Sequence, residues 1–214
     1  MRTLWQILVL LLLALAGHAE LLDRIAITVG RDVITEQQIY EQLRIAAFLD
    51  GAQPEFTQQQ LRDTADRMVL QRLVLQDMEA NGFPLPSDEE VKQALRDSRE
   101  KHWGSSAAFE KAARDANVST EAVTDFLTRL VATIKYIDFR FKPAVRVSDA
   151  TLLELYQARY NALDPQAGEP PPFEEVRQSL EDEAVAERVD QALERWLQDA
   201  RERAGVRYMP EVVP

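Results

Sequence analysis

The sequence contains no cysteine, only two histidines and only seven glycines among its 214 residues. Without cysteine the chain forms no disulfide, no thiol nucleophile and no thiolate metal site. One histidine, His18, lies near the N-terminus just after an apolar run, so His102 is the only histidine in the rest of the chain. These absences exclude cysteine-based catalysis and leave little room for histidine chemistry.

The residues with catalytic potential do not form a recognisable site. A general base needs a nucleophile and an orienting partner, and the serines that follow His102 do not form a nucleophile elbow. We interpret His102 as an exposed residue at the end of a helix, close to the negative end of its dipole. No His or carboxylate set has metal-ligand spacing, and no glycine-rich loop suits a phosphate. We therefore predict no cofactor, no metal and no use of ATP.

Acidic residues outnumber basic ones, 36 against 25, and the formal net charge is −11. The densest acidic clusters are residues 88–90 and 181–183. We interpret the first as the opening turn of a helix, where carboxylates favour the positive dipole end, and the second as a solvated helix face. The overall negative charge argues against nucleic acid and anionic membranes as partners.

Residues 1–19 have the layout of a secretory signal peptide. Arg2 gives a positive start, residues 4–16 are apolar, and small residues stand three and one positions before a cut after Ala19. The apolar run is shorter than the ~20 residues of a membrane-spanning helix, although an uncleaved anchor is the alternative. We expect export to the periplasm or an equivalent compartment. Cleavage would change the net charge to −12, because it removes one Arg and no acidic residue.

A strand, a turn and a strong helix start follow the leader. Arg24–Val29 alternates as a strand does, and Gly30 begins a turn before the short return strand Val33-Ile34. Thr35 with Gln38 three residues later forms a capping box, which marks the start of a helix.

Cap residues, glycines and prolines predict seven helices in all, at about residues 35–50, 57–81, 87–103, 106–115, 119–141, 148–161 and 173–204. Residues 206–209 then read as a short strand, and we expect this strand to pair with the hairpin near residues 24–34. The predicted fold class is mainly α: a multi-helix core with a small antiparallel sheet that joins the N-terminal hairpin to the C-terminal strand.

Apolar periodicity assigns several side chains to the core. The helix at 119–141 has a stripe with spacings of four and three, formed by Val123, Leu127, Leu130, Ile134 and Ile137. We also place four aromatic residues in the core: Phe126, Phe139, Trp196 and Tyr208. Seven others lie near loops or on thin apolar stripes and are candidates for partner binding: Phe56, Phe83, Trp103, Phe109, Tyr156, Tyr160 and Phe173.

The order of these segments resembles the SurA family of periplasmic chaperones and, more distantly, PrsA and trigger-factor-like folding helpers. Three segments carry the resemblance: DRIAITVGRDVITEQQI at 23–39, MVLQRLVLQDMEAN at 68–81, and the stretch from PFEEVRQSL to GVRY at 172–208. The resemblance implies a helical N-terminal domain with a β-hairpin at 20–163 and, at 173–214, a C-terminal helix and strand that pack back on it.

Most members of that family insert a parvulin-type prolyl isomerase domain before the C-terminal helix. Here only the Pro-rich linker 164–172 stands at that position, and nine residues cannot hold a domain. The resemblance therefore implies an ATP-independent periplasmic chaperone that is not an enzyme and that holds unfolded secreted or outer-membrane proteins in a groove. A prolyl isomerase relative and an adaptor subunit of an envelope complex are the alternatives, and the sequence leaves the oligomeric state open.

Overall fold

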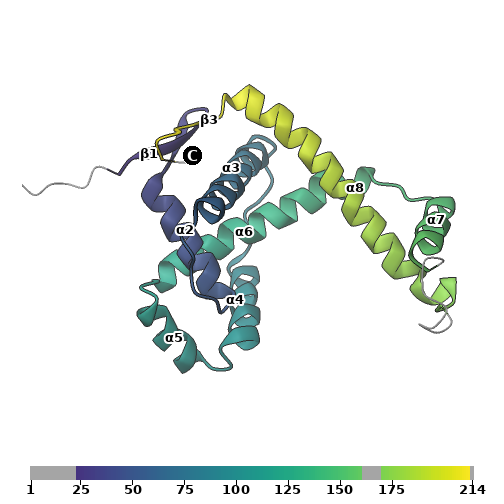
Figure 1. Ribbon diagram of the computed structural model, residues 1–214, viewed down its shortest axis with the longest axis horizontal. Coiled ribbons are helices and arrows are strands. Elements are labelled where there is room, and N and C mark those ends of the chain that lie inside the picture. The colour runs from purple at the N-terminus through teal and green to yellow at the C-terminus, as the bar shows by residue number, and fades with distance from the viewer. Residues whose placement is uncertain (1–22, 161–169, 213–214) are drawn as a thin grey trace, which may run out of the picture.

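The computed structural model describes residues 23–160 and 170–212. Within these residues the chain is mainly helical, with one small sheet (Figure 1). This confirms the predicted fold class. The elements in chain order are β1 (Ile25–Val29), β2 (Asp32–Thr35), α2 (Glu36–Leu49), α3 (Gln58–Ala80), α4 (Asp88–His102), α5 (Ser106–Asp115), α6 (Thr120–Phe141), the 3₁₀ helix η1 (Lys142–Ala144), α7 (Asp149–Tyr160), α8 (Phe173–Ala204) and β3 (Arg207–Tyr208).

The sheet joins segments from opposite ends of the described chain. Its strand order is β2-β1-β3, and both pairs are antiparallel. Gly30, with φ of +62°, makes the turn between β1 and β2, and its N–H donates to the carbonyl of Ala204 at 2.8 Å. The N–H of Met209 donates to the carbonyl of Ala26 at 2.8 Å. The predicted pairing of the C-terminal strand with the hairpin is therefore confirmed.

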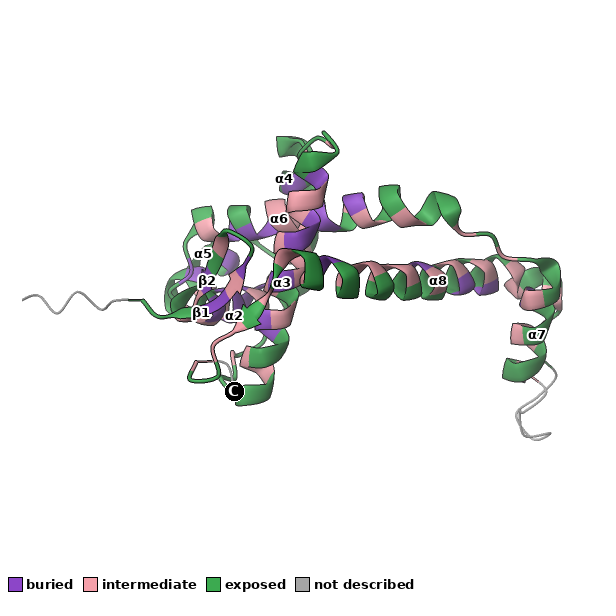
Figure 2. Cartoon of the chain, turned by 90° about the horizontal axis from the view of Figure 1, so that it is seen from above, coloured by how far each residue is buried: buried purple, intermediate pink, exposed green. Residues whose placement is uncertain are grey.

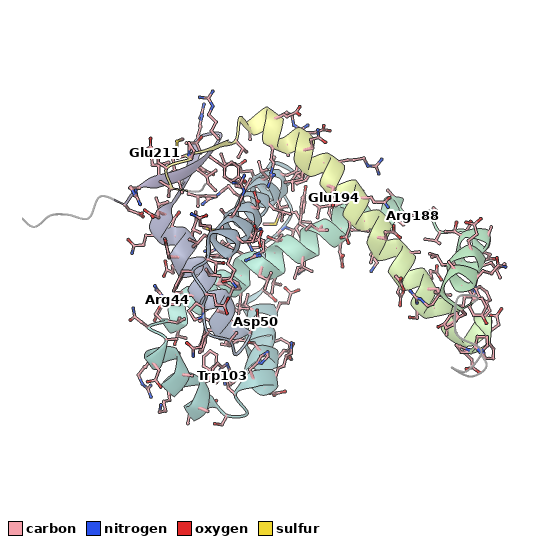
Figure 3. All side chains as sticks on the ribbon, viewed as in Figure 1. Arg44, Asp50, Trp103, Arg188, Glu194 and Glu211 are labelled. Carbon is pink, nitrogen blue, oxygen red and sulfur yellow. The ribbon has the colours of Figure 1, made fainter. Side chains whose placement is uncertain are left out.

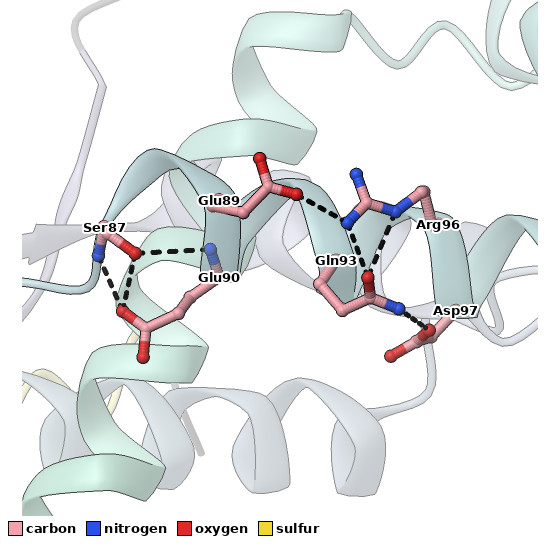
Figure 4. A network of polar contacts seen from close by, with 6 residues as sticks. All are labelled: Ser87, Glu89, Glu90, Gln93, Arg96 and Asp97. Carbon is pink, nitrogen blue, oxygen red and sulfur yellow. Dashed lines mark hydrogen bonds and ion pairs between the residues drawn. The ribbon is translucent and has the colours of Figure 1, made fainter.

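Side-chain caps fix the starts of α2 and α4 as the sequence predicts. Thr35 and Gln38 form the reciprocal capping box of α2. Ser87 and Glu90 form the same motif at the start of α4 (Figure 4). In the acidic cluster at 88–90, Glu89 binds Arg96 on the next turns of the helix, so this cluster has the structural role expected of it.

Four apolar clusters hold the elements together. The first lies between the sheet, α3 and the end of α8, and the second lies between α2, α4, α5 and the start of α6. A third cluster joins α3 to the second half of α6, where Val74, Met78, Ala132 and Tyr136 are buried. The fourth is separate from the others and contains Leu152 of α7 with Leu180 and Ala184 of α8.

The core assignment for α6 is wrong at two positions in the second half of the helix, whereas Ile137 packs against the third cluster as predicted. Val123 and Leu127 are buried, but Ile134 is 54% exposed and Phe139 is 58% exposed. The buried positions shift to Ala132 and Tyr136 because α6 leaves the second cluster and packs on α3 through the third. Position 132 is nine residues after 123, which is two and a half turns of helix and thus the opposite face.

Helix α8 runs from the sheet to α7, which lies at the far end of the molecule (Figure 1). Figure 2 shows that much of α8 is exposed between its two ends. Its first turns pack on α7, and Trp196, Leu197 and Ala200 near its end pack on the sheet and α3. The predicted core residues Trp196 and Tyr208 are partly buried against this first cluster, and Phe126 is buried.

Two predictions lie outside the described residues, wholly or in part. The signal peptide at 1–19 is outside them, as are residues 164–169 of the linker. In the described segments, no helix combines the length and the apolar character needed to cross a bilayer.

Candidate functional site

The structure distributes the seven candidate aromatic residues over four places. Phe56 packs on Tyr40 with ring centroids 5.3 Å apart, and Phe83 packs against the end of α6. Trp103 and Phe109 lie in the second apolar cluster, and Tyr156, Tyr160 and Phe173 lie beside the fourth. These residues therefore do not line one common groove.

Trp103 and Phe109 pack in the second apolar cluster, between α2, α4, α5 and the start of α6. Both rings contact Phe48 of α2, at centroid distances of 5.2 and 5.0 Å. Phe109 is only 4% exposed. Its contribution is to the core, so we do not retain it among the surface candidates.

Tyr156, Tyr160 and Phe173 form an aromatic group where α7 meets α8. The rings of Tyr156 and Phe173 meet edge to face at 5.6 Å, and the rings of Tyr156 and Tyr160 lie 4.9 Å apart. The Tyr156 hydroxyl donates to the carbonyl of Pro171 at 2.7 Å. This group fastens the residues that precede α8 to α7.

Phe83 belongs to an exposed apolar surface, which we call the α6-end patch and define as Phe83, Leu85 and Phe139. The rings of Phe83 and Phe139 are 4.7 Å apart, and Leu85 follows Phe83 by two residues. Leu85 is 64% exposed and Phe139 is 58% exposed. These are the two highest exposed fractions among the large apolar side chains in the described part of the chain. Through Phe83 the patch adjoins the third apolar cluster, against which Trp196 of α8 also packs.

A network of polar side chains around Asp77 joins α3 to α6 next to the patch. The Tyr136 hydroxyl donates to Asp77 at 2.7 Å, and Arg140 pairs with the same carboxylate at 3.0 Å. Burial and the Asp77 carboxylate both raise the pKa of Tyr136. Asn81 donates to the Tyr136 oxygen at 3.0 Å. The end of α3 and the second half of α6 are therefore held in a fixed relation, and the patch has a rigid base.

A second surface lies where the end of α6 and η1 meet α8. It is a cavity of about 450 Å³, and four arginines contribute to its lining: Arg140, Arg146, Arg188 and Arg195. Arg188 lies near the middle of α8, in the region where the end of α6 reaches this helix (Figure 3). Phe141, Ala144, Val145 and Ala192 supply apolar walls. We call this surface the arginine pocket.

Sequence reasoning missed Leu85 and the arginine pocket. Leu85 is flanked by Pro84 and Pro86, which indicate an extended, exposed segment and offered a usable signal. The arginines come from residues 140–146 and 188–195, so no local run of positive charge marks them.

A further cleft of about 460 Å³ lies between α2, α3 and α6. Its lining is mixed, with Ile34 and Met68 beside Gln42, Arg72 and other polar side chains. Within the described ranges, no group of three His, Cys, Asp or Glu side chains has the geometry of a metal site. His102 lies at the end of α4 beside Gly51, where a Cβ on the glycine would be 3.0 Å from the His102 Nδ1 atom.

Comparison with known proteins adds no assignment: no protein-family model matches the chain, and no curated protein matches its sequence.

Proposed function

We propose that this protein is an ATP-independent chaperone of the periplasm or an equivalent exported compartment, similar to the SurA family. It binds unfolded secreted or outer-membrane proteins. The observation that supports the proposal best is the α6-end patch. An apolar surface on a rigid base suits contact with the apolar side chains of an unfolded chain.

The shape of the molecule fits the same proposal. The sheet and α7 stand at opposite ends of α8 (Figure 1). The patch adjoins the third apolar cluster, against which Trp196 of α8 also packs. A client polypeptide bound there would make weak apolar contacts at several points. The acidic remainder of the surface would keep the complex in solution. Release would follow folding of the client or its transfer to a tighter receptor.

The test of the proposal is suppression of aggregation. An outer-membrane protein unfolded in urea is diluted into buffer, and light scattering is followed with and without the purified protein. We expect scattering to fall at several-fold molar excess of the protein. Undiminished scattering at that excess would refute the chaperone function.

Variants then test the patch itself. Leu85→Ser and Phe139→Ser remove exposed apolar surface, and we expect each to weaken suppression while the thermal midpoint changes little. Val33→Thr is the matched control, because Val33 is an exposed apolar residue on β2, away from the patch, and threonine keeps its branched shape. Full suppression by both serine variants would leave the chaperone function standing and would reject the patch as its site.

An adaptor subunit of an envelope complex is the second candidate, since an exposed apolar patch also suits one dedicated partner. A pull-down with the purified protein distinguishes the two. A chaperone captures many clients in small amounts, whereas an adaptor captures one protein in stoichiometric amount. The prolyl isomerase alternative predicts faster cis–trans exchange on a proline-containing peptide.

A further inference from the structure

The arginine pocket stands out in a chain with a net charge of −11. Of its four arginines, Arg140 is committed within the protein: it pairs with Asp77, and its guanidinium lies 5.6 Å from the ring centroids of both Phe141 and Trp196. This arginine builds the wall of the pocket and holds α6 against α8.

The other three arginines have no carboxylate partner among the ion pairs of the described residues. Arg146 donates to the carbonyls of Pro143 and Val145 at 2.8 and 2.9 Å, and Arg188 donates to the carbonyl of Arg146. Arg195 donates through Nε to the carbonyl of Gln191 at 3.1 Å. These bonds position the side chains without neutralising them, and a guanidinium has five N–H donors.

Three positioned guanidinium groups around an apolar-walled cavity fit one chemistry, a carboxylate carried on an apolar segment. We propose that the arginine pocket binds acidic stretches of polypeptide in which Asp or Glu alternates with apolar residues. The guanidinium groups would take the carboxylates through charge-assisted hydrogen bonds. Phe141, Ala144, Val145 and Ala192 would contact the apolar neighbours.

The net charge of the protein also favours a polypeptide over a membrane as the partner of the arginine pocket. A lipid surface that presents phosphates is large and negative, and it repels the acidic remainder of this protein. A single segment of polypeptide reaches the cavity without bringing that wider field. The inference goes beyond the proposed chaperone function, because it assigns a charge preference to a surface distinct from the α6-end patch.

The test uses two short fluorescein-labelled peptides, one with alternating Glu and Leu and one with Gln in place of each Glu. Fluorescence anisotropy in low salt gives the dissociation constant of each for the purified protein. We expect the acidic peptide to bind at least about tenfold more tightly, which corresponds to the loss of one good charge-assisted contact. Equal affinities for the two peptides would overturn the proposal.

The double variant Arg188→Gln, Arg195→Gln identifies the pocket, and we expect it to lose roughly tenfold in affinity for the acidic peptide. The matched control is Arg203→Gln with Arg207→Gln, which removes two exposed arginines near the C-terminal end of the described chain and changes the net charge equally. Unchanged affinity in the double variant, or an equal loss in the control, would refute the site. Tight binding of anionic vesicles that the double variant alone abolishes would reassign the pocket to phosphate headgroups and also overturn the proposal.

These peptide measurements do not depend on aggregation assays. A protein that suppresses aggregation but binds both peptides equally retains the proposed function and loses this inference. A protein that discriminates the peptides but suppresses nothing retains the inference and loses the proposed function.

Discussion

Removal of the Tyr208 hydroxyl tests the hydrogen bond that joins the C-terminal strand β3 to helix α3. Asp66 of α3 accepts hydrogen bonds from Tyr208 of β3 at 2.5 Å and from Arg201 of α8 at 3.1 Å. One carboxylate therefore ties the long helix and the last strand to the N-terminal helices. Tyr208→Phe removes one of these bonds and leaves the ring in place.

The expected cost follows from the environment of the bond. A hydrogen bond to a charged group contributes about 1.5–3 kcal/mol when it is buried. The Asp66 side chain is 43% exposed, so water replaces part of the lost contact. We expect Tyr208→Phe to lower the free energy of unfolding by about 1 kcal/mol, which is a fall of about 2–4 °C in the thermal midpoint.

Urea denaturation measures this cost, and a double-mutant cycle with Asp66→Asn isolates the pair. In the Asp66→Asn background we expect Tyr208→Phe to cost much less, because the charged acceptor is already absent. Tyr40→Phe is the control, since no hydrogen-bond partner of the Tyr40 hydroxyl is found in the described part of the chain. An equal cost of Tyr208→Phe in both backgrounds would contradict the argument.

The same bond gives a pH signature. Burial, and then the Asp66 carboxylate, raise the pKa of Tyr208 above its usual value of 10.0. A raised folded-state pKa means that the stabilisation is complete below about pH 10 and is lost as the pH rises through the folded pKa. The stability difference between the natural protein and Tyr208→Phe should therefore shrink above about pH 10.

Two further predictions concern the contact between α7 and α8 and the start of α4. Leu180→Ala truncates a side chain with no exposed surface between α7 and α8, and we expect a local cost of about 2–5 kcal/mol. Hydrogen exchange should then become faster in α7 and remain unchanged in α3; Leu153→Ala, at an exposed position, is the control. The Lys135 side chain, followed by Ser87, lowers the pKa of Glu90 to about 2 from 4.5, so its stabilisation should be lost as the pH falls between those values. Thermal midpoints of Glu90→Gln and the natural protein should converge over that range, and a constant difference would contradict the assignment.

The sequence was sufficient for features that depend on neighbouring residues. Helices α4 and α6 begin where the caps Ser87 and Ser119 indicate, and α8 begins after the prolines and ends at Gly205, because caps and breaks act within a few residues. The pairing of residues 206–209 with the hairpin was predicted from their strand-like pattern together with the family resemblance. The register, with Ile27 opposite Tyr208, was not predictable, because it depends on the three-dimensional path of α8.

The site was less predictable than the fold. An apolar stripe shows which residues favour burial, but it does not show when the neighbours of a helix change. Helix α6 changes neighbours between Leu127 and Ala132, so Ile134 is exposed although the apolar stripe continues unbroken in the sequence. The arginine pocket was harder to predict, because its two pairs of arginines, at 140 and 146 and at 188 and 195, come from segments that are more than forty residues apart in the chain.

The wrong core assignment of Phe139 bears on the proposed binding surface. A helix that only needed to fold would carry polar residues on the face it turns to water, and α6 instead carries Ile134 and Phe139 there. Local departures from consistent patterning concentrate at functional sites. Arg140, the next residue, forms a wall of the arginine pocket. A polypeptide that crosses the end of α6 would therefore meet apolar surface and then guanidinium groups, so the two proposed surfaces together favour client segments in which apolar and acidic residues are close neighbours.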